Sequence, residues 1–290
     1  MTYRWGVLTL IAITVVWGTT FVVVKESLTT ISVPLLLALR FSLASACFAW
    51  LRVDRRAIVP AIGLGLLAFV GFATQTIGLS LTSASNAAFI TGLAVVLTPA
   101  VGALWFRDRV PGRVVLAGVV AVVGLALLTG GGPDGLNAGD VWVLGTAVAY
   151  ACYIVYLGRV ARRASAMSLA GLQHLPMALL AWVWAWPDVS TLASVPPATF
   201  AAIAYLAVVA TAAVAVAQTY AQRVVSAPVA AIIFVLEPLF AALLAWIVLA
   251  EVLGTLGWIG GALVVVAMLI GEGRLRLPRV RPRPRPPAPS

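Results

Sequence analysis

Charged side chains are scarce in this sequence of 290 residues, in which Asp, Glu, Lys and Arg together make up only 10%. Soluble globular domains have about 25% charged and 45–50% apolar residues. Here apolar residues reach 62%, and the mean hydropathy is +1.08. So few charged groups could not cover a surface that faces water. The composition therefore predicts an integral membrane protein.

Side chains for acid–base or metal chemistry are also few, with one His, nine acidic residues and two Cys. No pair of carboxylates or histidines at helical spacing gathers at the end of an apolar run. A metal site, another cofactor and an enzymatic activity are therefore not expected. Cys47 and Cys152 both fall inside apolar runs, where cysteine usually acts as a small packing residue rather than as half of a disulfide.

The sequence does contain apolar runs long enough for membrane helices. The first spans 20 residues, about 30 Å as a helix, and Lys25-Glu26 follows it instead of a signal-peptide cleavage site. We expect an all-α polytopic membrane protein with ten transmembrane helices. The ten runs cover residues 5–24, 34–51, 60–79, 84–106, 112–128, 141–158, 167–186, 199–219, 228–249 and 253–271.

Basic residues alternate with these runs. If both termini are cytoplasmic, 17 of the 19 basic residues lie in inside segments, and the exceptions are Lys25 at an outer helix end and Arg40 inside the second run. Cytoplasmic loops of membrane proteins are enriched in Lys and Arg. We therefore expect a multi-pass protein of the cytoplasmic (inner) membrane with both termini inside. The net charge of +10 then reflects contact with the lipid bilayer, and no nucleic-acid partner is expected.

An internal repeat organises the chain. Residues 226–233 match residues 83–90 at an offset of 143. At the same offset Leu93 meets Leu236, Asp108 meets Glu251, and Gly118 meets Gly261. A constant offset indicates duplication, so residues 1–137 and 138–272 are predicted to be two repeats of five helices.

An odd number of helices per repeat makes the two copies insert in inverted orientation. Inverted repeats are typical of secondary transporters, whose binding site lies between the halves near the middle of the membrane. The Arg- and Pro-rich tail, residues 273–290, cannot form a packed structure and is expected to be a disordered cytoplasmic segment along the anionic leaflet.

Polar residues inside the apolar runs are costly in hydrocarbon and are candidates for the site. Glu237 precedes Pro238, which opens the helix, so its carboxylate could bind an ammonium group or a coupling proton; alternatively it is a neutral group hydrogen-bonded between helices. Arg40 could hold a carboxylate, pair with Glu237 or reach the outer surface. His174 could relay protons or simply be a packed side chain.

Aromatic and amide side chains complete the candidate site. Trp17 and Thr20 share a helix face, as do their repeat counterparts Tyr150 and Tyr153. The four could line a central cavity for a small amphipathic molecule, or could serve only helix packing. Further donors and acceptors come from Gln75, Asn86 and Gln218.

Several motifs resemble those of the EamA-type transporters of the drug/metabolite transporter superfamily. The motifs are Trp17-Gly18-Thr19-Thr20-Phe21, Arg40-Phe41, Leu236-Glu237-Pro238 and Leu249-Ala250-Glu251. Two positions depart from the family pattern, with Asp108 where Glu is usual and Val252 where Arg is usual. The resemblance implies a permease of the cytoplasmic membrane that exports amino acids or other small metabolites.

The favoured function is therefore a secondary transporter that works by alternating access to a central cavity and takes a small-molecule substrate. A membrane-embedded enzyme, a lipid-handling protein, and a channel or scaffold remain alternatives. Gly257 and Gly261, four residues apart in the last run, indicate close helix contact and suggest a possible homodimer.

Overall fold

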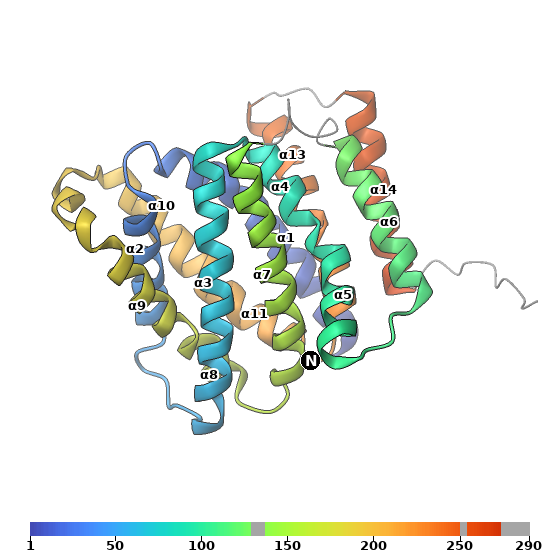
Figure 1. The fold of residues 1–290 in the computed structure, drawn as a ribbon, viewed down its shortest axis with the longest axis horizontal. Coiled ribbons are helices and arrows are strands. Elements are labelled where there is room, and N and C mark those ends of the chain that lie inside the picture. Colours follow the sequence, from blue (N-terminus) through green and yellow to red (C-terminus); the bar gives the residue numbers. More distant parts are fainter. Residues whose placement is uncertain (129–136, 250–253, 274–290) are drawn as a thin grey trace, which may run out of the picture.

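The computed structural model describes residues 1–128, 137–249 and 254–273, and within these ranges all regular elements are helices, joined by short loops, without strands (Figure 1). The prediction of an all-α protein is confirmed. The α-helices are α1 (Tyr3–Ser27), α2 (Val33–Ala46), α3 (Ile58–Leu81), α4 (Ala84–Gly92), α5 (Ala94–Phe106), α6 (Gly112–Leu128), α7 (Ala138–Val160), α8 (Ala166–Leu172), α9 (His174–Ala185), α10 (Pro197–Ala207), α11 (Val214–Ala221), α12 (Ala227–Phe234), α13 (Leu236–Leu249) and α14 (Thr255–Glu272). Short 3₁₀ helices cover Arg55–Ala57 and Trp186–Ser194, and a π-helical turn covers Val208–Ala213.

Polar caps fix where several helices begin. Asn137 starts α7 with a capping box, in which its side chain and that of Asp140 each accept a backbone N–H of the other residue. Ser32 and Ser83 cap α2 and α4 with single bonds, in which their hydroxyl groups accept the backbone N–H of Leu35 and Asn86. These caps satisfy backbone donors that the helices themselves leave unpaired.

Many of these helices suit a membrane. Among the described residues, seven helical segments are long and apolar enough to cross one, and Val33–Ala46, Gly112–Leu128 and Ala227–Leu243 are shorter apolar helices. Exposed apolar side chains cover the outside of the bundle, which a lipid environment accommodates. The chain is a multi-pass membrane protein.

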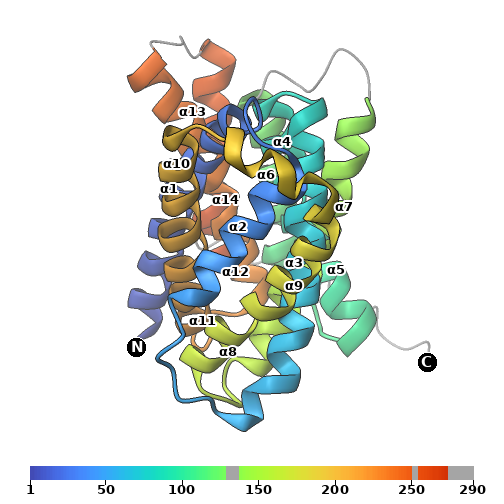
Figure 2. The ribbon, with the colours of Figure 1, turned by 90° about the vertical axis from the view of Figure 1, so that its left-hand side faces the viewer.

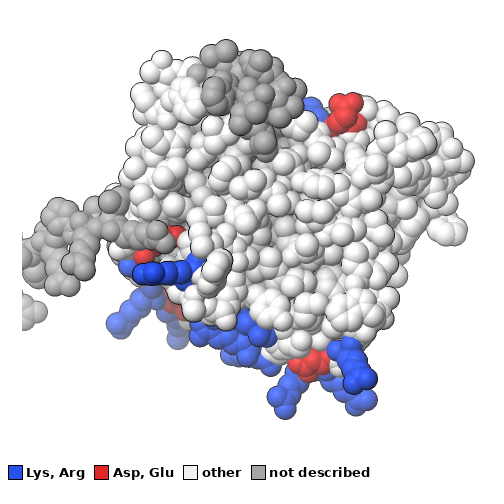
Figure 3. Space-filling model, turned by 180° about the vertical axis from the view of Figure 1, so that it is seen from behind, with Lys and Arg blue, Asp and Glu red and all other residues white. Residues whose placement is uncertain are grey.

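The two ends of the bundle differ in charge. The α2–α3, α5–α6 and α7–α8 connections, which carry most of the loop arginines, lie at the same end as the N-terminus (Figure 1). Figure 3 shows Lys and Arg gathered along that end of the molecule. Trp50 and Trp105 are exposed near it, while Trp142 and Trp186 are exposed near the opposite end. Tryptophan is enriched at both membrane interfaces.

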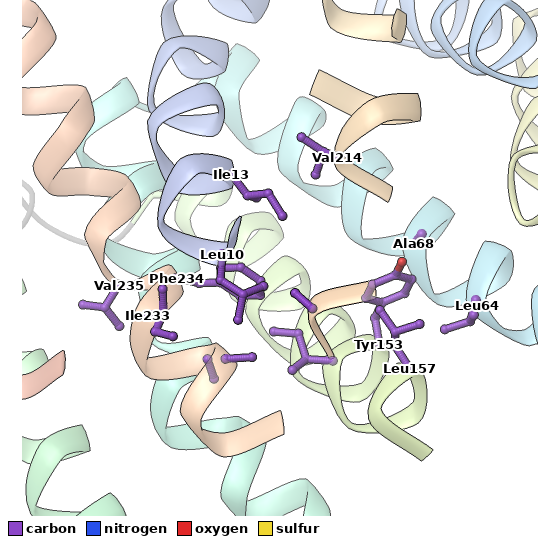
Figure 4. Packing of buried hydrophobic residues seen from close by; sticks show 14 of the residues in the cluster. Leu10, Ile13, Leu64, Ala68, Tyr153, Leu157, Val214, Ile233, Phe234 and Val235 are labelled. Carbon is purple, nitrogen blue, oxygen red and sulfur yellow. The ribbon is translucent and has the colours of Figure 1, made fainter. Parts of the chain in front are cut away.

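Contacts between the two halves of the chain come in corresponding pairs. Helices that the predicted repeat makes equivalent pack on each other: α2 on α9, and α6 on α14 (Figures 1 and 2). In the first half, α3 and α5 pack against α7 of the second half. In the corresponding arrangement, α11, α12 and α13 of the second half pack against α1 of the first. The apolar core runs through both halves, as Figure 4 shows for Leu10 and Ile13 of α1, Leu64 of α3, Leu157 of α7 and Ile233 of α12.

The α6–α14 contact depends on glycine. A Cβ on Gly260 would lie 2.6 Å from the carbonyl oxygen of Gly124, so the two backbones touch. A Cβ on Gly261 would meet Leu239 of the same chain at 2.8 Å. The predicted close helix contact is therefore made within the chain. A homodimer stays a prediction, and it would need a different surface from the one that Gly261 presents to Leu239.

Polar contacts join the halves at both ends. At the basic end Arg159 forms an ion pair with Asp108, and at the other end Thr82 Oγ1 donates to Asp140 Oδ1 at 2.8 Å. The predictions for Glu251 and for tail residues 274–290 concern residues outside the described ranges.

Candidate functional site

A cavity lies at the centre of the bundle, with about 90 Å³ in which the centre of a water molecule can move. Its lining comes from both halves of the chain, on α1–α5, α7, α9 and α11–α13 and at the helix breaks. Of the predicted site residues, those that line the cavity are Trp17, Thr20, Arg40, Gln75, Tyr150, Tyr153, His174, Gln218 and Glu237. The structure thus brings together side chains that are up to 220 positions apart in sequence, from Trp17 to Glu237.

Three helical segments beside the cavity are interrupted by a single residue, at Leu93, Gln173 and Val235, and proline explains the last two breaks. Helix α8 ends at Leu172 and α12 ends at Phe234, each four residues before a proline, Pro176 or Pro238. Proline has no N–H and cannot donate to the carbonyl four residues earlier, so the helical ladder stops there. The predicted opening of the helix at Pro238 is confirmed. Glu237 consequently projects from the first turn of a new helix.

Arg40 is 2% exposed and does not reach the outer surface. Its Nε donates to Thr211 Oγ1 at 2.7 Å, and its guanidinium carbon lies 4.6 Å from the centre of the Phe72 ring. Within the described residues it forms no ion pair with Glu237. The Nη1 and Nη2 groups have no protein acceptor among these residues.

Glu237 is only partly buried, because one side of it faces the cavity. In the described part of the chain no donor forms a hydrogen bond with its carboxylate. A group with this placement can accept hydrogen bonds from a molecule in the cavity. The alternative, a glutamate hydrogen-bonded between helices, finds no such bond among the described residues.

Aromatic rings form much of the cavity wall. Trp17 Nε1 donates to the Ala210 carbonyl at 3.3 Å, and its ring contacts Phe234 with 5.1 Å between centroids. The Tyr153 hydroxyl donates to Gln173 Oε1 at 2.9 Å. These bonds hold large side chains in place around the cavity.

Weaker polar contacts occur on the α3 side. The Tyr150 hydroxyl donates to Gln75 Oε1 at 3.4 Å, and Gln75 Nε2 donates to Thr91 Oγ1 at 3.4 Å. Distances this long leave the amide and hydroxyl groups available for a ligand. Thr20 donates to the Trp17 carbonyl one turn earlier and faces the cavity from α1.

His174 lines the cavity from the start of α9. It is 1% exposed, stacks on Phe48 with 5.7 Å between ring centroids, and its Nδ1 has no hydrogen-bond partner in the described part of the structure. The packing role considered for this residue accounts for the stacked ring, and a role in proton relay stays a prediction.

Asn86 lies apart from the other predicted residues and does not line the cavity. It sits in the first turn of α4, where its Nδ2 donates to Thr82 Oγ1 at 3.4 Å. The same hydroxyl group receives Asn137 Nδ2 and donates to Asp140. Asn86 therefore belongs to a polar cluster at the end of the bundle, because its place near a helix start puts it away from mid-membrane.

Sequence reasoning missed Thr211 and Gln173 as members of the site. Gln173 occupies the break between α8 and α9, and Pro176 three residues later could have indicated it. Thr211 lies in a π-helical turn whose sequence contains neither Gly nor Pro, so no local pattern marks it. No cluster of three or more potential metal ligands occurs among the described residues.

Comparison with known proteins agrees with this architecture. The sequence pattern of the EamA-like transporter family matches twice, at residues 4–130 and 137–270. An uncharacterized transporter of Archaeoglobus fulgidus is 30% identical over 263 residues, which cover 89% of this chain and 82% of that protein. A crystal structure with 19% sequence identity superposes with a TM-score of 0.75 over 93% of this chain and 97% of its own, and so shares the fold. The chain belongs to the EamA-like transporter family.

Proposed function

We propose that this transporter exports amino acids or similar small amphipathic metabolites across the cytoplasmic membrane by alternating access to the central cavity. Its ten membrane helices form two inverted repeats, residues 1–137 and 138–272, with both termini in the cytoplasm. The corresponding pairs of helix contacts between the halves support the repeat. The arginine-rich end, which contains the N-terminus, supports the orientation.

The observation that carries the substrate class is that two side chains of opposite charge face one cavity and, among the described residues, form no ion pair. Arg40 offers two N–H-bearing nitrogens and Glu237 offers a carboxylate, and neither is neutralised by the other. A zwitterion with a carboxylate and an ammonium group complements both. Trp17, Tyr150 and Tyr153 supply an aromatic wall for its apolar part.

The size of the cavity fits this class. One water molecule needs about 10–15 Å³ of such volume, so the cavity has room for roughly six to nine water-sized groups. An amino acid with a medium-sized side chain has about that many non-hydrogen atoms. Lipids and large drugs would require the cavity to widen.

Alternating access needs contacts that can open at one end while those at the other end hold. The Thr82–Asp140 hydrogen bond and the Asp108–Arg159 ion pair join the two halves at opposite ends of the bundle. The helix breaks at Gln173 and Val235 provide points beside the cavity where helices can bend. Glu237 is the first candidate for exchanging a coupling proton, and His174 the second.

The test is a resistance and efflux screen in cells that overproduce the protein. Cells are loaded with dipeptides or challenged with toxic amino-acid and nucleoside analogues, and Glu237→Gln serves as the paired variant. We expect resistance and lower retained substrate with the native protein and neither with the variant.

Two other outcomes are informative. Resistance that persists in the Gln variant would support export and remove Glu237 from the mechanism. If membrane-inserted native protein protects against none of the compounds, export of amino-acid-like metabolites is contradicted.

A further inference from the structure

The π-helical turn Val208–Ala213 is an unexpected feature next to the cavity. It interrupts the helical segment between α10 and α11, where no proline or glycine requires a break. Thr211 Oγ1 donates to the carbonyl oxygen of Leu206, five residues earlier, at 2.7 Å. Such turns are less favourable than α-helix and occur often at functional sites. The side chains that this turn contacts can explain why it forms in place of regular α-helix.

The Thr211 hydroxyl has one proton and two acceptor lone pairs. Because the proton is used on Leu206, only the lone pairs can face Arg40, and one of them accepts Arg40 Nε–H at 2.7 Å. The same π-helical turn directs the Ala210 carbonyl oxygen toward Trp17, whose Nε1–H donates a hydrogen bond to it. One irregular turn in the second half thus holds two cavity side chains from the first half.

Two contacts fix the plane of the Arg40 guanidinium group. Thr211 holds its Nε edge, and the face of Phe72 lies 4.6 Å from its central carbon. A guanidinium group can bind a carboxylate through Nε and one Nη, or through both Nη nitrogens. Thr211 blocks the first mode and leaves the second, which places two parallel N–H donors at the end of the side chain.

We infer that Thr211 is a positioning residue, which orients Arg40 so that the cavity recognises a planar carboxylate through Nη1 and Nη2. This inference rests on the proposed function, since it concerns how the same cavity binds its substrate. A carboxylate matches the two parallel donors, whereas a carboxamide has one oxygen acceptor and places an NH₂ against the second donor. Selection of the acid over its amide follows from the orientation.

The test compares transport of L-leucine and L-leucinamide in proteoliposomes containing purified protein. Thr211→Val removes the hydroxyl group at constant shape, and Thr211→Ser retains it. For Val we expect the KM for leucine to rise about ten- to a hundredfold, the effect of losing one hydrogen bond to a charged group. The preference for leucine over leucinamide should decrease in the Val variant. The Ser variant should have the native KM for leucine and the native preference.

KM and the acid-to-amide preference do not depend on how much of the protein is folded, so they separate positioning from stability. If Val is not recovered as folded protein, Thr211→Ala takes its place with the same expectation. A Val or Ala variant with native KM and native preference overturns the inference. Native protein that carries leucine and leucinamide equally well also overturns it, while leaving the transport function in place. Failure of the native protein to carry either compound contradicts the proposed function itself, and with it the inference.

Discussion

Replacement of Arg40 by methionine should abolish transport while leaving the free energy of unfolding nearly unchanged. Burial of a charged group costs several kcal/mol. Two contacts of Arg40 offset this cost: the hydrogen bond from Nε to Thr211 contributes about 1.5–3 kcal/mol, and the contact with the Phe72 ring contributes about 2 kcal/mol. These terms roughly cancel. Since Arg40 has no carboxylate partner within the described residues, its removal leaves no opposite charge unpaired.

The effect on transport is larger. A substrate carboxylate bound by two Nη groups would lose two charge-assisted hydrogen bonds, which corresponds to a drop of at least about 100-fold in affinity. Methionine keeps the volume and apolar stem of arginine without its charge. The matched control is Arg52→Met, at an exposed arginine of the α2–α3 connection, which should preserve both transport and stability.

The assay combines leucine uptake into proteoliposomes with thermal unfolding of the detergent-purified protein. A change of 1 kcal/mol shifts the melting temperature by about 2–4 °C in a chain of 150–250 residues and by no more in a longer one, so we expect the Met variant of this protein of 290 residues to melt within about 4 °C of the native protein. Native uptake by this variant would refute the role given to Arg40. A drop of more than about 10 °C, with normal uptake by the protein that stays folded, would show that Arg40 is structural.

Two predictions concern stability. Gly260→Ala should destabilise the protein by about 1–3 kcal/mol, because its Cβ would press on the Gly124 carbonyl. Gly145→Ala is the control: the nearest atom to its Cβ would be Thr74 Cγ2 at 3.5 Å, and this variant should be more stable than the native protein by up to about 1 kcal/mol. Thermal unfolding checks both variants, and equal shifts in melting temperature would contradict the packing argument. The Ser165 and Arg56 backbone N–H groups donate to Asp54 and lower the pKa of its carboxyl group below 3.8. A lowered pKa stabilises the fold above the unfolded-state pKa and ceases to do so as pH falls through the folded-state pKa. Asp54→Asn should therefore melt below the native protein at pH 7, and the difference should shrink from about pH 4 downwards; a difference that is constant with pH would argue against this.

Much of the fold could be predicted because lipid imposes simple rules on sequence. Apolar runs of helical length and the clustering of arginine between them anticipated the helices and the end at which the basic loops gather. At an offset of 133, ten residues shorter than the one that matches residues 83–90 to 226–233, Trp17 and Thr20 align with Tyr150 and Tyr153, and all four line the cavity. A prolyl residue marked the helix break beside Glu237.

Other features depend on tertiary contacts that no local pattern records. The π-helical turn at Thr211 forms where Arg40 and Trp17 approach from other helices, so a stretch of Val, Ala and Thr gave no sign of it. Asn86 is as polar as Gln75 and also lies in an apolar run, but its position near the start of α4 takes it to the end of the bundle. Hydrophobicity shows that a residue lies in a helix; it does not show at what depth.

Counterflow tests the central claim, that the cavity is exposed to one side of the membrane at a time. Proteoliposomes loaded with unlabelled L-leucine are diluted into a trace of labelled L-leucine. The account predicts that label accumulates transiently inside above its outside concentration, and that protein carrying Arg40→Met shows no such overshoot. Label that enters without overshoot, at a rate proportional to concentration and without saturation, would indicate a channel and contradict alternating access.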